Sequence, residues 1–267
     1  MTATVTVITL AYNFEKYIGA CIQSTVDQTF DDWRLILIDD ASTDKTYEVM
    51  KKYESSKVTV IRNEKRVGAA KNLNTAISMA DTPFVTWIGG DDIAYPGRLQ
   101  ALLMVYEGVH MHFGRPVILH HSADKIDHDN KVVELDYIHR LNKPLPNLPM
   151  FDRLLLYDFI FGNPFFQKEV IRDTFPVPDE SECPDWIFFL NAARKYHFVY
   201  FPVPLTWYRV HSGGTNSQML PEWTQRHIRE RTLISKLYKL TETQNDMLFS
   251  VFRGTKYESL VNKPADD

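Results

Sequence analysis

Acidic side chains stand directly after three predicted strands, and they are the residues of this sequence most able to bind a polar ligand. The groups are Asp39-Asp40 after Leu35–Ile38, Asp91-Asp92 after Phe84–Ile88 and Gly89-Gly90, and Asp124 after Val117–Leu119. In open α/β sheets, ligands bind beyond the carboxyl ends of the strands. The sequence therefore predicts a ligand site that uses carboxylates at that edge of a sheet.

The pair Asp91-Asp92 has the composition of a site for a divalent cation. Two adjacent carboxylates repel each other unless a cation or hydrogen-bond donors compensate their charges. The preceding glycines allow a tight turn and a close approach of a ligand. Mg²⁺ or Mn²⁺ suits oxygen ligands and shares its coordination shell with phosphates and water. The alternative is a solvated turn in which Asp92 caps the helix that follows Pro96, and the local residues favour neither.

The pair Asp39-Asp40 also allows two interpretations. A carboxylate here can cap the helix that follows, because aspartate is a favoured residue at helix N-termini. It can equally accept hydrogen bonds from ribose hydroxyls or from a base N–H, as carboxylates at strand ends do in dinucleotide-binding folds. Both readings stay open at the level of the residues.

Strand and helix patterns alternate through the first hundred residues, and they must position these carboxylates. Strands are predicted over Val5–Leu10, Leu35–Ile38, Val58–Ile61 and Phe84–Ile88, with helices over 14–26, from Asp44 to Tyr53, and over 69–80. The run Leu35–Ile38 is apolar throughout, as in a central parallel strand covered on both faces. This alternation predicts an α/β fold with a parallel sheet and right-handed crossovers.

The second half of the chain has a looser pattern that predicts further strands and helices of the same sheet. They are a strand over Val117–Leu119, a hairpin turn over Asp127–Asn130, an extended connection over Leu141–Pro149, a helix over Asp185–Tyr196, a strand over Phe198–Phe201 and an amphipathic helix over Glu222–Lys239. We therefore expect residues 1–217 to form one domain with halves 1–140 and 150–217, followed by a C-terminal helical extension over 218–267.

Composition excludes several classes of protein. The 267 residues are 44% hydrophobic and 24% charged, which is ordinary for a soluble globular chain. The net charge of −4 provides no basic field for nucleic acid, and no stretch of about 18 apolar residues is present to span a membrane. Two cysteines form no disulfide framework, and the N-terminus lacks the features of a signal peptide. These features predict a cytoplasmic protein.

Several segments of the chain resemble family 2 glycosyltransferases with the GT-A fold, in the same order and with similar spacing. These segments are Val5–Asn13, Ser24–Phe30, Ile38–Asp44, Arg66–Asn72, Gly90–Asp92, Pro184–Trp186 and Tyr208–His211. The resemblance covers residues 3–217 and ends before the last predicted helix. It implies a Rossmann-like, three-layer α/β/α domain with a mostly parallel central sheet.

The resemblance also implies an activity. Members of this family move a sugar from a nucleotide diphosphate sugar to a hydroxyl group, here with inversion at the anomeric carbon. We expect the donor to be a UDP-hexose or UDP-N-acetylhexosamine, and the acceptor a glycan or lipid-linked glycan of cell-surface polysaccharide synthesis. The cofactor implied is Mn²⁺ or Mg²⁺.

The same resemblance assigns roles to individual residues. The nucleotide-sugar site would contain Leu10, Tyr12 against the base, Asp40 as acceptor for the base N–H, Lys71 near the nucleotide, and Asp91 facing ribose and sugar. Asp92 would bind the metal, His211 would add a metal or phosphate contact, and Asp185 would be the catalytic base. Three positions depart from the family: Leu10-Ala11 replaces Pro-Thr, Gly90 replaces an acid, and Pro184 replaces a glutamate.

Two other functions remain as alternatives. A sugar nucleotidyltransferase also uses a nucleotide-binding α/β sheet and Mg²⁺, but we find no N-terminal glycine-rich loop for a triphosphate. A non-catalytic nucleotide- or carbohydrate-binding module is the other. For the predicted helix Glu222–Lys239 the alternatives are packing on its own domain, peripheral association with the inner, anionic face of a membrane, and homodimerisation.

Overall fold

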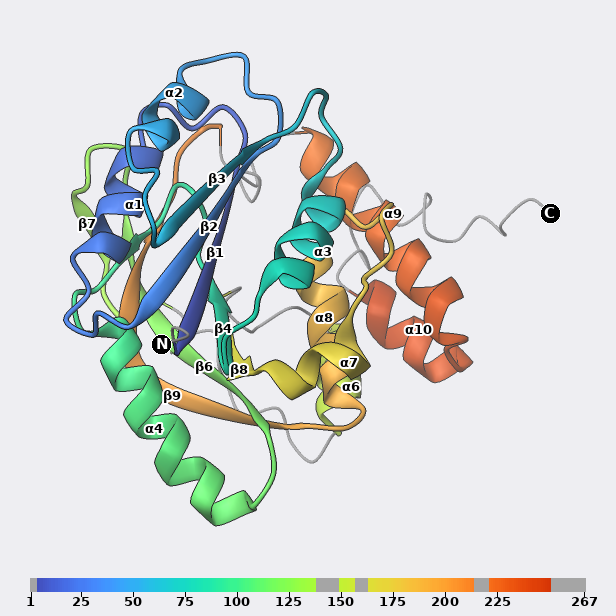
Figure 1. Cartoon of the computed structure of the whole chain (residues 1–267). Coiled ribbons are helices and arrows are strands. Elements are labelled where there is room, and N and C mark those ends of the chain that lie inside the picture. The colour runs from blue at the N-terminus through green and yellow to red at the C-terminus, as the bar shows by residue number, and fades with distance from the viewer. Residues whose placement is uncertain (1–3, 138–148, 157–162, 214–220, 251–267) are drawn as a thin grey trace.

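The computed structural model describes residues 4–137, 149–156, 163–213 and 221–250. Within this part of the chain, nine strands form one sheet in the order β3-β2-β1-β4-β8-β6-β9-β5, with β7 paired to β6 (Figure 1). Strands from both halves of the chain therefore share one sheet, as the sequence predicted. The predicted connection over Leu141–Pro149 lies outside the described residues except for Pro149.

The first four strands are parallel and match the predicted alternation. The elements are β1 (Val5–Ala11), α1 (Ile18–Val26), β2 (Trp33–Asp39), α2 (Thr46–Lys51), β3 (Val58–Arg62), α3 (Ala69–Met79) and β4 (Phe84–Trp87). Strand β1 pairs in parallel with β2 and β4, and β2 pairs in parallel with β3. Their carboxyl ends therefore lie at one edge of the sheet, where the acidic pairs follow.

The sheet becomes mixed beyond β4. The elements are β5 (Ile93–Ala94), α4 (Arg98–Phe113), β6 (Val117–Ile126), β7 (Val132–Glu134), α6 (Met150–Leu156), β8 (Phe165–Gln167), the 3-10 turn η1 (Lys168–Val170), α7 (Ile171–Thr174), α8 (Pro184–Ala193) and β9 (His197–Arg209). Strand β8 is antiparallel to β4 and β6, and β5 is antiparallel to β9, whereas β6 and β9 are parallel.

Strands β6 and β9 are longer than their apolar runs predicted. Strand β6 continues through His120, His121 and Ser122, whose side chains are all buried. The prediction that Asp124 follows the strand is wrong, because Asp124 lies within β6. Its carboxylate accepts from the Tyr95 hydroxyl at 2.5 Å and from a backbone N–H at 2.7 Å. These partners give Asp124 a structural role rather than a place at the ligand edge.

Two apolar layers cover the two faces of the sheet. One contains the buried residues of α1, α2 and α4, and the other contains those of α3 and α8. Helices on both faces make the three-layer α/β/α arrangement implied by the resemblance. Each large apolar side chain that is fully buried in these layers contributes about 1.5–3 kcal/mol to folding.

Two helices follow at the C-terminal end, α9 (Pro221–Tyr238) and α10 (Glu242–Phe249) (Figure 1). Helix α10 packs on α6 and α9, and α9 contacts α8 through Arg231 and Tyr238. Ile234 and Leu248 are fully buried in the same apolar layer as Trp186 of α8. The predicted helix over Glu222–Lys239 is therefore present, and one face of it packs on the chain's own core. None of the described helices has the length and apolar character needed to cross a membrane.

Candidate active site

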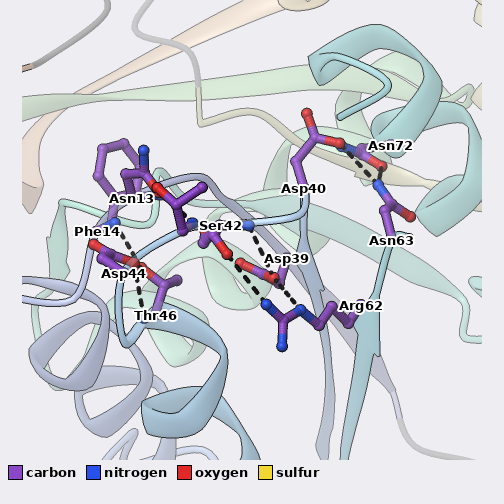
Figure 2. Close-up of polar contacts among 11 residues, drawn as sticks. Asn13, Phe14, Asp39, Asp40, Ser42, Asp44, Thr46, Arg62, Asn63 and Asn72 are labelled. Atoms are coloured by element: carbon purple, nitrogen blue, oxygen red, sulfur yellow. Dashed lines mark hydrogen bonds and ion pairs between the residues drawn. The ribbon is translucent and has the colours of Figure 1, made fainter. Parts of the chain in front are cut away.

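The turn after β1 is fixed by hydrogen bonds to the loop after β2 (Figure 2). The backbone N–H of Asn13 donates to Ser42 Oγ at 2.9 Å, and that of Phe14 donates to Thr46 Oγ1 at 2.7 Å. Asn13 has a φ of 58°, a left-handed conformation that asparagine tolerates better than most residues. This turn places Tyr12 at the carboxyl end of β1.

Asp40 is held by the segment that leads into α3. Its carboxylate accepts from the backbone N–H of Val67 at 2.8 Å, from that of Gly68 at 3.0 Å and from the Asn63 amide at 2.9 Å. Burial alone would raise the pKa of Asp40, but these hydrogen bonds together lower it. Two of these three donors reach Oδ1 and one reaches Oδ2, and a hydrogen bond with the Asn72 side chain contributes to the same lowering of the pKa.

The neighbouring Asp39 has a structural role. Its side chain is fully buried, and Oδ2 accepts from the Ser42 N–H at 3.2 Å and lies 3.5 Å from Arg62 Nε (Figure 2). Asp44 accepts from the Thr46 N–H at 2.9 Å, at the start of α2. Asp39 and Asp44 therefore shape the loop, while Asp40 lies beside the segment that leads into α3.

Two cationic side chains, Arg66 and Lys71, stand around the start of α3. The Arg66 guanidinium carbon is 4.1 Å from the centre of the Tyr12 ring, which is the geometry of a cation–π contact. Lys71 is exposed in the first turn of α3. The sequence assigned no role to Arg66, although the residue stands within a segment that carried the resemblance.

The turn Gly89-Gly90 requires residues without a side chain. A Cβ on Gly90 would lie 2.9 Å from the Leu10 carbonyl oxygen, and a Cβ on Gly89 would lie 2.9 Å from Asp91 Oδ1 and 3.0 Å from Asp92 Oδ2. The glycines therefore let both carboxylates bend back over the turn. They also bring the turn against Leu10 at the end of β1.

Asp92 is a buried carboxyl whose surroundings oppose its ionisation. Its side chain is buried, and burial followed by the nearby charge of Asp91 raises its pKa well above the ordinary value. Its Oδ1 accepts from the Arg209 N–H at 2.9 Å. The His211 Nε2 atom lies 3.1 Å from Asp91 Oδ2. Hard oxygen donors with excess negative charge, and a histidine beside them, fit a divalent cation.

This fit is incomplete in one respect. Among the residues that the structure describes, no three His, Cys, Asp or Glu side chains are arranged to hold a metal ion. Asp91, Asp92 and His211 would therefore supply only part of a coordination shell. Mg²⁺ and Mn²⁺ commonly complete such a shell with phosphate oxygens and water.

Arg209 joins the acidic turn to the β6–β7 hairpin. Its Nε donates to the Asp91 carbonyl oxygen at 2.7 Å, and its two terminal nitrogens donate to the Asp127 carbonyl oxygen at 2.8 Å and Asn130 Oδ1 at 2.7 Å. The guanidinium also lies over the Tyr17 ring. The sequence analysis missed this role, although the predicted turn over Asp127–Asn130 is confirmed.

Substitution of Arg209 is expected to loosen the acidic turn. Arg209→Lys retains the charge but loses the planar set of donors that reaches three oxygens at once. We expect a loss of about 2 kcal/mol or more in the free energy of unfolding, since hydrogen bonds of charged groups contribute about 1.5–3 kcal/mol each. We also expect weaker binding of UDP in the presence of Mn²⁺. Urea denaturation and calorimetry measure both.

Arg34→Lys provides the matched control, because Arg34 is exposed on β2. This variant is expected to keep the stability and UDP affinity of the wild type. Wild-type stability and UDP affinity in Arg209→Lys would show that the guanidinium does not hold the turn.

Asp185 lies at the second position of α8, after Pro184. Its Oδ1 accepts from the Trp186 N–H at 3.0 Å. Burial raises the pKa of Asp185, and the positive charge of Arg226 opposes this effect. Trp186 itself is buried and donates from its indole nitrogen to the Leu154 carbonyl oxygen at 2.9 Å, so it belongs to the core.

Side chains of α9 contact the turn that precedes α8. Glu230 accepts from the Ser181 hydroxyl at 2.6 Å and from the Glu182 N–H at 2.7 Å. Arg226 donates to the Glu182 carbonyl oxygen, and Arg229 donates to both oxygens of the Glu182 carboxylate. The sequence analysis missed these residues because α9 falls outside the resemblance and has no recognisable motif.

The predicted site residues therefore form two groups. The first group lies at or just beyond the ends of β1, β2, β4 and β9 and at the start of α3, and it contains Leu10, Tyr12, Asp40, Lys71, Asp91, Asp92 and His211. Asp185 is separate from them on α8, which packs against α3.

Comparison with known proteins yields a consistent set of relatives. The model of glycosyl transferase family 2 matches residues 6–175. The putative glycosyltransferase EpsE of Bacillus subtilis (strain 168) is 35% identical over 112 residues, which are 41% of this chain and 40% of EpsE. The UDP-Glc:alpha-D-GlcNAc-diphosphoundecaprenol beta-1,3-glucosyltransferase WfgD of Escherichia coli is 30% identical over 175 residues, 62% of this chain and 66% of WfgD. The chain thus spans less than two thirds of the length of these two relatives.

The fold has a counterpart among solved structures. The crystal structure of S. aureus TarS 1-349 in complex with UDP-GlcNAc superimposes with a TM-score of 0.65 at 18% identity. The superposition covers 97% of this chain and 76% of the TarS chain. At this identity the likeness establishes a shared fold, which includes the helices α9 and α10 that lie beyond the family match.

Proposed function

Because the chain belongs to glycosyl transferase family 2, we propose that it is an inverting glycosyltransferase that moves a sugar from a UDP sugar to a hydroxyl of a lipid-linked glycan. One observation carries this proposal: Asp40 follows β2, and Asp91 and Asp92 follow β4, the two strands that flank β1 in parallel, while hydrogen bonds lower the pKa of Asp40 and keep it ionised as an acceptor. A donor nucleotide would lie across the carboxyl ends of these strands.

The donor and acceptor classes follow from the relatives. WfgD is described as using UDP-glucose and a GlcNAc-diphosphoundecaprenol acceptor, and TarS was crystallised with UDP-GlcNAc. For this chain we propose a UDP-hexose or UDP-N-acetylhexosamine as donor, with Tyr12 against the uracil and Asp40 accepting its N–H. Lys71 and Arg66 would face the negatively charged donor from the α3 side.

A divalent ion, Mn²⁺ or Mg²⁺, is part of this proposal. Asp91, Asp92 and His211 would hold it, and when bound it would act as a Lewis acid on the departing diphosphate. Arg209 would keep Asp91 and Asp92 in place through its contacts with both residues. Asp185 would accept the proton of the attacking hydroxyl, and Trp186 N–H would orient its carboxylate.

A product assay tests the proposal against the alternatives. The protein is incubated with Mn²⁺, UDP-glucose or UDP-GlcNAc, and a synthetic GlcNAc-diphosphate lipid, and the lipid is examined by mass spectrometry. A mass increase of one hexose or N-acetylhexosamine with release of UDP supports a transferase. In a parallel incubation with UTP and glucose 1-phosphate, formation of UDP-glucose with release of pyrophosphate indicates a nucleotidyltransferase. Binding of the UDP sugar without turnover in either incubation indicates a module without catalysis.

The remaining partner predictions concern α9. Its packing through Ile234 on the chain's own core agrees with the first of the three alternatives for this helix. Peripheral association with an anionic membrane face, homodimerisation and a cytoplasmic location stay predictions. Sedimentation with phosphatidylglycerol vesicles and the mass measured by light scattering test the first two.

UDP is expected to bind more tightly than CDP. Uracil offers a ring N–H to Asp40 Oδ2, whereas the corresponding nitrogen of cytosine is an acceptor and would leave the carboxylate without this partner. An unmatched buried polar group costs about 1–3 kcal/mol, so we expect a preference of roughly 10-fold or more. Calorimetry with both nucleotides in Mn²⁺ measures it.

The two nucleotides carry the same diphosphate and ribose, so each serves as the control for the other. Equal affinities would remove Asp40 from the base site. They would leave the rest of the proposed donor site unaffected.

A further inference from the structure

Glu230 is a buried carboxylate that connects α9 to the start of α8. Its side chain is 1% exposed, and it accepts from the Ser181 hydroxyl and the Glu182 N–H. The first backbone N–H groups of a helix, and those of the residues just before it, have no hydrogen-bond acceptors within the helix. The residue before α8, Cys183, offers no side-chain cap. Glu230 therefore supplies from a distant helix the acceptor that the local sequence lacks.

A second set of contacts holds the same turn. Arg226 donates to the Glu182 carbonyl oxygen, and Arg229 pairs with the Glu182 carboxylate. On the other side of the turn, Arg231 lies over the Trp186 ring, with its guanidinium carbon 4.6 Å from the ring centre. Helix α9 thus contacts the residues on both sides of Asp185.

Glu230 is also close enough to Asp185 for their charges to interact. Burial raises the pKa of Glu230, hydrogen bonds from Ser181, Glu182 and Cys183 oppose this effect, and the charge of Asp185 raises it further. The repulsion is mutual, so a negative Glu230 makes Asp185 bind a proton more tightly.

The other charged groups around Asp185 come from α9 and from the preceding turn. The positive charge of Arg226 acts on Asp185 directly, and Glu182 is paired with Arg229. His227 has its pKa lowered to about 4, mainly by burial and then by the charges of Arg231 and Arg226, so it is neutral near neutral pH. Among these groups, Glu230 is the buried carboxyl whose pKa the charge of Asp185 raises.

We propose that Glu230 is a positioning residue for catalysis: through Ser181 and the backbone of Glu182 it fixes the start of α8 and thereby the direction of the Asp185 carboxylate. This inference rests on the proposed role of Asp185 as the base. It makes α9 part of the acceptor side of the active site, although the family match ends at residue 175.

Two variants of Glu230 separate its hydrogen bonds from its charge. In Glu230→Gln the amide oxygen can accept from the Glu182 N–H, and the amide nitrogen can donate to Ser181 Oγ, because a hydroxyl both donates and accepts. This variant keeps the hydrogen bonds and loses the charge. Glu230→Ala loses both. If Glu230→Ala fails to fold, Ser181→Ala replaces it in the test, because this variant removes only one hydrogen bond.

Glu230→Ala is expected to lower kcat with UDP-glucose, Mn²⁺ and the GlcNAc-diphosphate lipid by ~10-fold or more, because small displacements of a catalytic group can cost up to about 10²-fold. The KM for UDP-glucose should not change, since the donor site lies elsewhere. Ser181→Ala should show a smaller loss of kcat in the same direction.

Glu230→Gln is expected to keep kcat near neutral pH and to change the pH profile. Activity is lost as pH falls through the pKa of Asp185, because only the ionised form accepts a proton. Removal of the Glu230 charge lowers that pKa, so the acid limb of kcat/KM moves to lower pH. A residue that merely stabilised the fold would leave the limb in place.

Asn74→Ala is the matched control for stability. Asn74 ties α3 to Val177 through two hydrogen bonds, 2.8 Å and 3.0 Å long, and to Asp179 through one of 3.1 Å, whereas Glu230 acts on Ser181 and Glu182. This variant should lower the melting temperature while kcat and the acid limb stay as in the wild type. Loss of kcat in Asn74→Ala to the same extent as in Glu230→Ala would overturn the inference. Wild-type kcat in Glu230→Ala, or an unmoved acid limb in Glu230→Gln, would also overturn it.

A spectroscopic measurement keeps this test separate from the proposed function. The carboxyl carbon of Asp185 is followed by ¹³C NMR as pH changes, in the wild type and in Glu230→Gln, with Asp185→Asn to assign the signal. A downward shift of the Asp185 pKa in Glu230→Gln supports the inference. Absence of sugar transfer by the wild type would refute the proposed function, whatever the NMR result. If the wild type transfers sugar but the titration of Asp185 is the same in Glu230→Gln, the inference about Glu230 is refuted.

Discussion

Asp185→Asn is expected to lose at least ~10²-fold in turnover, the usual scale of general-base catalysis. Direct displacement with inversion needs one group that takes the proton of the attacking hydroxyl. The carboxylate of Asp185 can do so when ionised, and the amide of asparagine cannot. Asp185 is the second residue of α8, and its side chain is partly exposed.

The same substitution should leave the fold unchanged. Asparagine retains a side-chain oxygen for the Trp186 N–H, which Asp185 Oδ1 now accepts. Replacement of a carboxyl whose pKa is raised by burial also removes a buried charge, so the melting temperature should not fall. Metal-dependent binding of UDP should stay at the wild-type level.

The measurement is a comparison of kcat for sugar transfer in wild type and Asp185→Asn, with UDP calorimetry and thermal unfolding on the same samples. Glu180→Gln, an exposed residue of the preceding loop, is the control and should transfer normally. Near-normal transfer by Asp185→Asn would reduce Asp185 to a residue that shapes the start of α8.

Asp92→Ala is expected to abolish the gain in UDP affinity that a divalent ion provides. The diphosphate of UDP adds negative charge beside Asp91 and Asp92, which already repel each other. A cation must therefore accompany the nucleotide, and metal contacts of this kind contribute several kcal/mol. We expect wild-type protein to bind UDP at least ~10-fold more tightly in Mn²⁺ or Mg²⁺ than in EDTA, and the variant to bind it equally in both.

Asp92→Asn tests the same point with less disturbance, because asparagine keeps an acceptor for the Arg209 N–H. Loss of one of two repelling charges should leave the metal-free protein at least as stable as the wild type. Asp81→Asn, an exposed residue before β4, is the control. If UDP affinity is indifferent to EDTA and to both Asp92 variants, the metal assignment is wrong.

The nucleotide half of the fold could be predicted because its information is local. Apolar runs such as Leu35–Ile38 specify a buried strand without reference to the rest of the chain, and the alternation with helices specifies parallel pairing. The boundaries of β1 to β4 agree with these predictions to within about two residues. The acidic pairs at the strand ends were found for the same reason.

The second half was less predictable because long-range contacts decide it. His120, His121 and Ser122 are polar, yet they are buried in β6, where pairing with β9 satisfies the backbone. No local pattern shows that such residues will form a central strand. The strand order around β8, which is antiparallel to both of its neighbours, is likewise a property of the assembled sheet.

The sequence by itself determined the family, the position of the carboxylates after the strands, and the residue types that could bind a nucleotide and a metal. Only the tertiary structure distinguished Asp40, whose carboxylate is held by the segment that leads into α3, from Asp39, which is fully buried beside Arg62. It also joined the acidic turn to Arg209, and the start of α8 to Glu230. Residue types and strand patterns are read locally, whereas the partner of a buried charge is set by which distant segments pack together, and the sequence contains no short-range signal for that choice.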